Sequence, residues 1–325
     1  MVRKTEKLKA IDLFAGIGGV RIGFESAGFD IVYSNDFNEK AAETYRMNFD
    51  EIDESDILEV AKENNVKRIP KKIDILLAGF PCQPFSVAGK GLGFEDEGRG
   101  KLIFAVIDLL KKRKPAAVFL ENVKNLQYHD DKKTFKKVEE VLSDAGYKWI
   151  KAQVLNSMDY GNVPQTRERI YIVGFREKKH FDKFCFPEKE VLTATMSSIL
   201  EKDVDDKYYY SEKDKIIYPR LKEVVNHRDR FYQYRRVYVR ENKSGVCPTL
   251  TASMGMGGHN VPIIRDQKGI RKLTPRECAR LQGFPESFLL PENQADNHLY
   301  RQIGNSVTVP VVARIAENIR ITLES

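Results

Sequence analysis

Apolar residues in the first half of the chain form short runs, and amphipathic stretches separate these runs. Runs of the length of buried strands occur at 8–14, 30–34, 73–78 and 116–120. Stretches with apolar residues at helical spacing occur at 38–49 and 101–114, and Pro115 ends the second of them. Two more strand patterns follow at 149–155 and 169–175. This alternation predicts an α/β fold with a mostly parallel sheet.

The pattern changes beyond about residue 178, where strands and helices no longer alternate. A helix is predicted at 271–285. An apolar-faced helix follows at 307–322, and it should return to the first domain. We therefore expect one domain made of residues 1–185 and 303–325. A smaller, mainly β or irregular domain with a hinge should comprise residues 186–302.

Cys82 follows the predicted strand at 73–78. Gly79, Phe80 and Pro81 end that strand, because proline has no N–H for the ladder. The cysteine thus lies just past a carboxyl strand end, where open α/β sheets place their ligands. The loop 83–93 is polar and rich in glycine, which favours a nucleophile under a movable lid. A buried, inert cysteine is the alternative at this point.

A glycine turn at 15–19 follows the first strand and leads into a helix. Glycine lets the backbone approach a ligand closely, and the helix N-terminus is positive. The dinucleotide fingerprint needs a further glycine where Arg21 stands, so a different nucleoside cofactor is favoured. Asp36, about 20 residues on, could bind a ribose, and Phe37 could stack on an adenine. A helix cap for Asp36 and a core position for Phe37 are the alternatives.

Charged residues follow two later strand patterns. The strand at 116–120 delivers Glu121 to the same edge as Cys82, and a carboxylate buried there must be protonated or paired. A Glu with a raised pKa could protonate a ring nitrogen, while an ion pair with an arginine is equally compatible. Arg167 and Arg169 alternate just before the strand at 169–175, where they could point at one ligand or form a solvated turn.

The composition limits the classes of protein to which this chain can belong. The 325 residues carry a net charge of +7 and a pI near 9.0, which is compatible with a polyanionic partner. The four cysteines form no CxxC pair, so we expect neither a metal site nor disulfides, as in a reducing cytoplasm. No signal peptide or membrane-length apolar run occurs, so we expect a cytoplasmic protein without a membrane partner.

The segment 220–243 is rich in Lys and Arg, and four aromatic residues lie among them. These aromatic residues are Phe231, Tyr232, Tyr234 and Tyr238. The composition suits a nucleic-acid-binding face, and a strand edge protected by charge is the alternative. Arg235 and Arg236 are the candidates in this segment for reading base edges.

Six motifs together resemble those of the DNA (cytosine-5)-methyltransferases of type II restriction–modification systems. They occur in the family's order and cover nearly the whole chain: DLFAGIGG at 12–19, GFPCQPFS at 79–86, ENV at 121–123, QTRER at 165–169, RKLTPRECARLQGFP at 271–285 and GNSV at 304–307. The resemblance implies transfer of a methyl group from S-adenosylmethionine to carbon 5 of a flipped-out cytosine in a specific double-stranded DNA sequence. It also implies that residues 1–185 and 303–325 hold the catalytic site and the cofactor, and that 186–302 recognise the target.

The resemblance assigns roles to individual residues. Cys82 would be the nucleophile, Glu121 would contact the ring nitrogen, and Arg167 and Arg169 would lie near the cytosine carbonyl. The positions that would bind the cofactor are Phe14, Gly16, Gly18, Gly19, Asp36, Phe37, Asp56, Ile57, Leu102, Asn305 and Val307. DNA contacts are expected from Gln83 and Ser86, and Thr249 or Thr251 matches the recognition core.

The chemistry accounts for these residue types. A thiolate that adds to carbon 6 makes carbon 5 of the ring nucleophilic, and hydrogen bonds from Glu121 and Arg169 would stabilise the charge that develops. We expect a monomer that protects host DNA from a cognate restriction endonuclease without a stable complex. A tRNA cytosine-5 methyltransferase and a catalytically inactive DNA-binding regulator are the alternatives.

Overall fold

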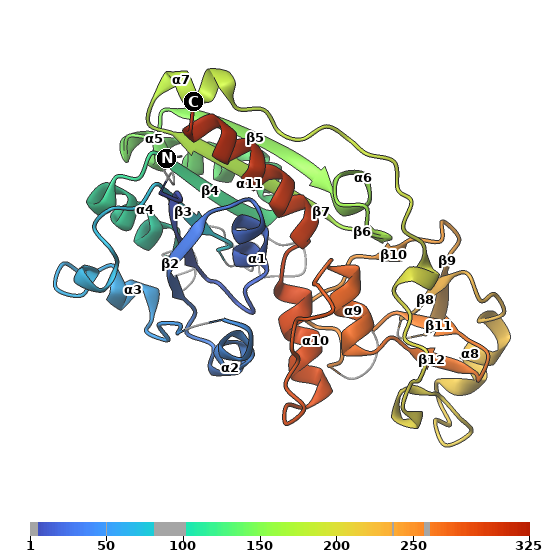
Figure 1. Ribbon diagram of the computed structural model, residues 1–325. Coiled ribbons are helices and arrows are strands. Elements are labelled where there is room, and N and C mark those ends of the chain that lie inside the picture. Colours follow the sequence, from blue (N-terminus) through green and yellow to red (C-terminus); the bar gives the residue numbers. More distant parts are fainter. Residues whose placement is uncertain (1–5, 50, 81–101, 236, 257–260) are drawn as a thin grey trace, which may run out of the picture. The chain divides into compact units, whose positions relative to one another are not determined.

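The chain forms two compact units in the computed structural model, which describes residues 6–49, 51–80, 102–235, 237–256 and 261–325 (Figure 1). The first unit comprises Met1–Leu155, Glu168–Glu188 and Val311–Ser325, and the second comprises Asn156–Arg167 and Lys189–Pro310. The sequence placed the boundaries at 185/186 and 302/303 and kept 156–167 in the first domain. The catalytic and recognition roles of the two domains stay predictions.

The first unit is built on a six-stranded sheet with the order β2-β1-β3-β4-β7-β5. The strands are β1 (Lys9–Leu13), β2 (Asp30–Asn35), β3 (Ile75–Ala78), β4 (Ala117–Val123), β5 (Trp149–Asn156) and β7 (Glu168–Phe175). Strands β2, β1, β3 and β4 pair in parallel, and β7 runs antiparallel to β4. The predicted α/β fold with a mostly parallel sheet is confirmed.

Helices lie between these strands and after them, and those predicted at 38–49 and 101–114 are among them. They are α1 (Gly19–Ser26), α2 (Glu39–Asn48), α3 (Ile57–Val60), α4 (Leu102–Arg113), α5 (Lys133–Asp144), α7 (Lys178–Lys183) and α11 (Val309–Leu323). The start of α2 is fixed by Asn38, whose side chain accepts the N–H of Ala41. Within the described part of the chain, no helix combines the length and apolar character needed to cross a membrane.

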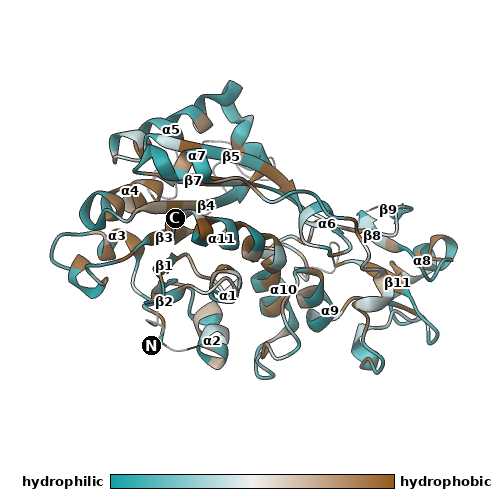
Figure 2. Cartoon of the chain, turned by 45° about the horizontal axis from the view of Figure 1, so that its top comes forward, coloured by the Kyte–Doolittle hydropathy of each residue, from teal (hydrophilic) through white to brown (hydrophobic). Residues whose placement is uncertain are grey.

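The sheet is buried on both faces, as parallel sheets require. Side chains of alternate strand positions, including Ile11 and Leu13, pack with helices α3, α4 and α5 into one core. Apolar colouring follows these strands, while the outer helix faces are polar (Figure 2). On the other face, Phe24 of α1 packs edge-on against Phe119 of β4, with ring centroids 5.2 Å apart. Asp12 alternates with Ile11 and Leu13 along β1, so its side chain lies on this second face of the sheet.

Helix α11 belongs mainly to the first unit, as predicted from its apolar face. It packs so closely on α1 that a Cβ added at Gly23 would lie 2.7 Å from the Val312 side chain. The Arg314 guanidinium also donates to the Glu188 carbonyl at 2.9 Å. The last helix therefore completes the layer that begins with α1.

The second unit contains a four-stranded antiparallel sheet with the order β12-β11-β8-β9. Its strands are β8 (Phe231–Arg235), β9 (Tyr238–Asn242), β11 (Ile263–Arg265) and β12 (Ile270–Lys272). A two-residue parallel pair joins β6 (Gln165–Thr166) to β10 (Cys247–Pro248). The helices are α6 (Ser157–Tyr160), α8 (Tyr218–Val224), α9 (Pro275–Leu281) and α10 (Asp296–Asn305).

Two sequence-based expectations for this unit need correction. The stretch 271–285 is not one helix: its first residues extend β12, and α9 begins only at Pro275, after the cap at Thr274. Phe231, Tyr232 and Tyr234 do not form a stacking face, because they are 0%, 0% and 3% exposed. Of the four aromatic residues only Tyr238 is exposed, on β9 at the edge of the sheet. The aromatic pattern therefore reflects a sheet core.

Candidate functional site

The carboxyl ends of β3 and β4 come together, as the parallel register requires. Ala78 pairs with Leu120, so Gly79 lies beside Glu121, and a Cβ on Gly79 would be 3.7 Å from the Glu121 carboxylate. The Asn122 side chain donates to the Phe80 carbonyl at 3.1 Å. Sequence reasoning missed this role of Asn122, although its place in the ENV motif pointed to it. The chain leading to residue 81 is thus fixed against β4.

Glu121 and Arg169 form an ion pair at this edge. The register places Val123 opposite Arg169, and the Arg169 Nε lies 3.2 Å from the Glu121 Oε1. Both side chains are largely buried, at 11% and 15% exposure. The ion pair that the sequence left open is therefore present, and it joins two residues that were predicted to act on one ring. Cys82, Gln83 and Ser86 lie outside the described residues.

Arg167 has a different environment from Arg169. Its guanidinium, buried in the second unit, donates to the carbonyls of Leu250 at 2.8 Å and Gly304 at 3.3 Å, and also to that of Ser306. These partners are backbone groups of the same unit. A contact between Arg167 and a cytosine stays a prediction from the resemblance.

The turn after β1 has an unusual backbone. Phe14, Gly16 and Gly18 have φ values of +57°, +56° and +87°. A left-handed conformation at an aromatic residue costs about 1–2 kcal/mol, so it marks a position where function is a reasonable hypothesis. No described atom lies within 4 Å of a Cβ built on Gly16, whereas a Cβ on Gly18 would lie 2.2 Å from the Phe49 ring. The described atoms therefore leave space beside the backbone at Gly16, whereas the Phe49 ring fills that space at Gly18.

Asp36 holds this turn to the end of β2. One carboxylate oxygen accepts the N–H of Gly16 at 2.8 Å, and the other accepts the N–H of Asn38 at 2.9 Å. Burial raises the pKa of Asp36, although these two donors oppose the effect. The N-cap of α2 is Asn38, and Phe37 is 68% exposed. Asp36 is thus not the helix cap, and Phe37 is not a core residue.

Asp12 is a fully buried carboxyl in β1. Neither of its oxygens has a hydrogen-bond partner of normal geometry among the described residues. Loss of hydration raises its pKa to about 8, although the positive charge of Arg21 opposes the shift. The Arg21 guanidinium binds Glu25 at 2.7 Å and the Tyr45 hydroxyl at 2.8 Å. The residue that breaks the dinucleotide fingerprint therefore connects α1 to α2.

Replacing Asp12 with Asn should stabilise the ligand-free protein above neutral pH. The folded-state pKa, about 8, lies far above the ordinary aspartate value of 3.8, so this carboxyl favours folding below pH 4 and loses that contribution as the pH rises toward 8. Asn mimics the protonated form, so the variant should gain on the order of a few kcal/mol at pH 8 and little at pH 4.

Urea unfolding of both proteins at the two pH values measures this difference. Asp30→Asn is the matched control, because it makes the same chemical change at an exposed position of the same sheet, where no gain of a few kcal/mol is expected. A loss of stability at pH 8 in the Asp12 variant would show instead that the carboxylate is ionised and paired.

The other predicted cofactor residues occupy varied environments. Gly19 is the first residue of α1, Asp56 caps α3 by accepting the Leu58 N–H at 2.9 Å, and Ile57 is buried in the core. Leu102 opens α4 and is partly buried against that core. In the second unit, Asn305 is exposed at the end of α10 and Val307 is buried. Their roles toward a cofactor stay predictions.

The predicted DNA-binding residues that the structure describes lie in the second unit. Arg235 is exposed at the end of β8, where it donates to the Gln233 side chain at 2.9 Å. The Thr249 hydroxyl donates to the Thr166 carbonyl at 2.7 Å, and Thr251 is exposed beside Ser253. Arg236 lies outside the described residues. No contact in the structure tests whether these side chains bind DNA.

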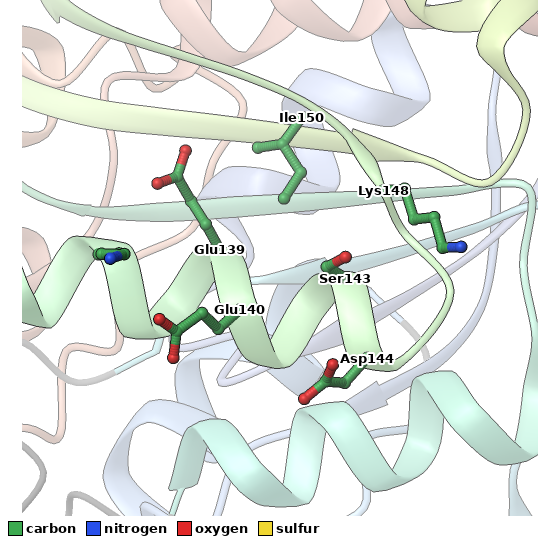
Figure 3. A pocket seen from close by; sticks show the side chains of 7 residues that line it. Glu139, Glu140, Ser143, Asp144, Lys148 and Ile150 are labelled. Carbon is green, nitrogen blue, oxygen red and sulfur yellow. The ribbon is translucent and has the colours of Figure 1, made fainter.

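A shallow hollow along α5 and the start of β5 contains none of the predicted site residues. The side chains of Glu139, Glu140, Asp144 and Lys148 surround it, with Ile150 at its base (Figure 3). Partial burial raises the pKa of Glu139. The remaining charged groups of the hollow belong to α5 and to Lys148 just beyond it, and they carry no function in the proposals below.

Comparison with known proteins identifies the family. The sequence pattern of the C-5 cytosine-specific DNA methylases matches residues 8–320. The type II methyltransferase M.Bsp6I of Bacillus sp. strain RFL6 is 51% identical over 315 residues, which cover 96% of this chain and 98% of that protein. M.HpaII of Haemophilus parainfluenzae is 39% identical, with 97% of this chain and 89% of that protein covered.

Solved structures agree in fold. The methyltransferase EhMeth of Entamoeba histolytica superposes with a TM-score of 0.74 at 20% identity, covering 97% of this chain and 98% of that one. The Dnmt2 methyltransferase of S. pombe gives a TM-score of 0.71 at 21% identity, covering 98% and 99%. At these identities the likeness concerns the fold alone. With the family pattern over nearly its whole length, the chain belongs to the C-5 cytosine-specific DNA methylases.

Proposed function

We propose that this enzyme methylates carbon 5 of one cytosine within a specific double-stranded DNA sequence, as the modification partner of a restriction endonuclease. The observation that carries the proposal is the Glu121–Arg169 ion pair, buried at the strand edge where the chain continues toward Cys82. The relatives named as type II methyltransferases support the role in a restriction–modification system. We propose a monomer that acts on the same DNA as the endonuclease without a stable complex.

S-adenosylmethionine is the proposed cofactor, and residues of the first unit fit its chemistry. Asp36 presents a carboxylate tied to the glycine turn, Phe37 presents an exposed ring, and Gly16 leaves space beside the backbone. When bound, this cofactor supplies a methyl group on a positively charged sulfur.

The protein side chains would prepare the cytosine for that methyl group. In this proposal the Cys82 thiolate adds to carbon 6 of the flipped base, and carbon 5 becomes nucleophilic. Once carbon 5 carries the methyl group, a base removes the carbon 5 proton and the Cys82 thiolate leaves carbon 6, which restores the ring double bond and frees the enzyme. Glu121 would hold a proton at the ring nitrogen N3, and Arg169 would donate to the O2 oxygen, so both would stabilise charge as it develops. Their mutual ion pair keeps the two groups oriented before the base arrives.

Bisulfite sequencing of DNA from cells that express the chain tests this function. We expect protected cytosines within one short sequence motif and none in cells that express the Cys82→Ala variant. Purified enzyme should methylate duplex DNA and leave tRNA unmodified. Methylation of tRNA alone would favour the RNA methyltransferase, and sequence-specific binding without methylation would favour the inactive regulator.

A further inference from the structure

Arg167 lies at the junction of three segments of the second unit. Its guanidinium donates to the Leu250 carbonyl at 2.8 Å, to the Gly304 carbonyl at 3.3 Å and to the Ser306 carbonyl. Gly304 and Ser306 lie at the C-terminal end of α10, where free carbonyls make the helix end negative. A planar group with five donors can serve several carbonyls at once, which a lysine ammonium cannot match in geometry.

Neighbouring contacts tie the same segments together independently of Arg167. The Leu250 N–H donates to the Gln165 side chain at 3.0 Å, so both polar backbone groups of Leu250 bind residues of the 165–167 segment. A Cβ added at Gly304 would lie 2.2 Å from the Thr251 carbonyl oxygen. The end of α10 therefore packs directly on the backbone at 251–252, with no room for a side chain between them.

We infer that Arg167 is a positioning residue that couples cofactor binding to DNA binding. The inference rests on the proposed function, because the resemblance assigns Asn305 and Val307 to the cofactor and Thr249 and Thr251 to DNA. Arg167 connects the backbone of both segments through one rigid side chain. A ligand that orders one segment thereby lowers the cost of ordering the other, which appears as a coupling free energy between the two ligands.

Binding measurements without turnover test this coupling. The affinity for S-adenosylhomocysteine is measured by calorimetry with and without a duplex that carries the sequence found by bisulfite mapping. In the wild type, DNA should tighten this binding at least about fivefold, the lower end of typical allosteric coupling. Arg167→Lys should reduce the effect to less than about twofold, because the ammonium cannot hold the two segments in the same geometry.

Gly304→Ala is a second variant that keeps Arg167 and forces the two segments apart, and it should lose coupling as well. Arg271→Lys is the matched control: Arg271 is buried in the same unit, but it pairs with the carboxylates of Glu277 and Asp266, and the carbonyl that it also binds is that of the adjacent Lys272. It should lower stability and keep the wild-type coupling. A merely structural role of Arg167 would lower the folded fraction and leave the coupling of the folded molecules intact.

Amide hydrogen exchange of the wild type tests the inference without any variant. S-adenosylhomocysteine alone should slow exchange at Leu250–Ala252 if the segments are coupled. Unchanged exchange there, a wild type without coupling, or full coupling in Arg167→Lys would overturn the inference. Failure of the proposed function is a separate result, namely a wild type that methylates no DNA.

Discussion

Cys82→Ala should abolish methyl transfer while leaving DNA binding intact. In the proposed reaction the thiolate forms the covalent bond that activates carbon 5, so nothing in the variant replaces it. The expected loss exceeds about 10³-fold in kcat, as for other enzymes that lose their nucleophile. A tritiated-methyl assay beside a gel shift measures the two properties separately.

Another cysteine of the chain provides a matched control for this experiment. Cys185 is an exposed free thiol, and Cys185→Ala should keep wild-type turnover. An oligonucleotide with 5-fluorocytosine at the target position should trap the wild type and the Cys185 variant covalently, because fluorine cannot leave as a proton does. Turnover by Cys82→Ala at the wild-type rate would remove Cys82 from the mechanism.

Glu121→Gln should lower kcat by about 10²–10³-fold, the cost of losing one preorganised group that stabilises developing charge. Glutamine keeps the size of the side chain but cannot hold a proton for the ring nitrogen, and it no longer balances the charge of Arg169, 3.2 Å away. Single-turnover kinetics with saturating DNA isolate the chemical step from binding.

The neighbouring ion pair between Lys124 and Glu168 serves as the control for Glu121. It has a shorter separation, 2.9 Å, but both side chains are more than 40% exposed. Such pairs contribute about 0–1 kcal/mol, so Glu168→Gln should leave kcat within a factor of two or three. Equal losses in the two variants would mean that general electrostatics of this edge, and not Glu121 itself, govern the rate.

The α/β fold was predictable because the patterns that indicate its strands and helices each lie within a short stretch of the sequence. Asp12 is the only buried charged residue in the apolar runs that became β1 to β4, all of which the structure describes, and the helices between them carry helical spacing. Proline at residue 115 marked the end of α4 correctly, whereas the cap of α2 is Asn38 and not Asp36, which the sequence offered as an alternative. The antiparallel placement of β7 beside β4 could not be read from the sequence, since strand direction depends on the path of the chain.

For the candidate site, the sequence predicted the place of Glu121 at a strand end but not the pairing of its side chain. The strand register brings Arg169 to Glu121, while the position of Cys82 stays a prediction. The sequence pattern could not show that Arg167 binds backbone carbonyls whereas Arg169 pairs with a carboxylate, because both arginines occupy equivalent alternating positions. The aromatic residues among the basic positions at 220–243 misled for a similar reason: tyrosine suits a sheet core as well as a nucleic-acid surface.

The close packing of Val312 on Gly23 has a consequence for synthesis of the protein. The first unit joins residues near the start of the sequence to residues 311–325, so its contacts span almost the full chain. Contacts of such separation form late, because the intervening loop must close first. A growing chain can form the sheet early. Helix α11 cannot pack on α1 until residues 311–325 have been made. Methylation activity should therefore begin only after synthesis has passed this helix, and a chain ending before residue 311 should expose the apolar surface of α1.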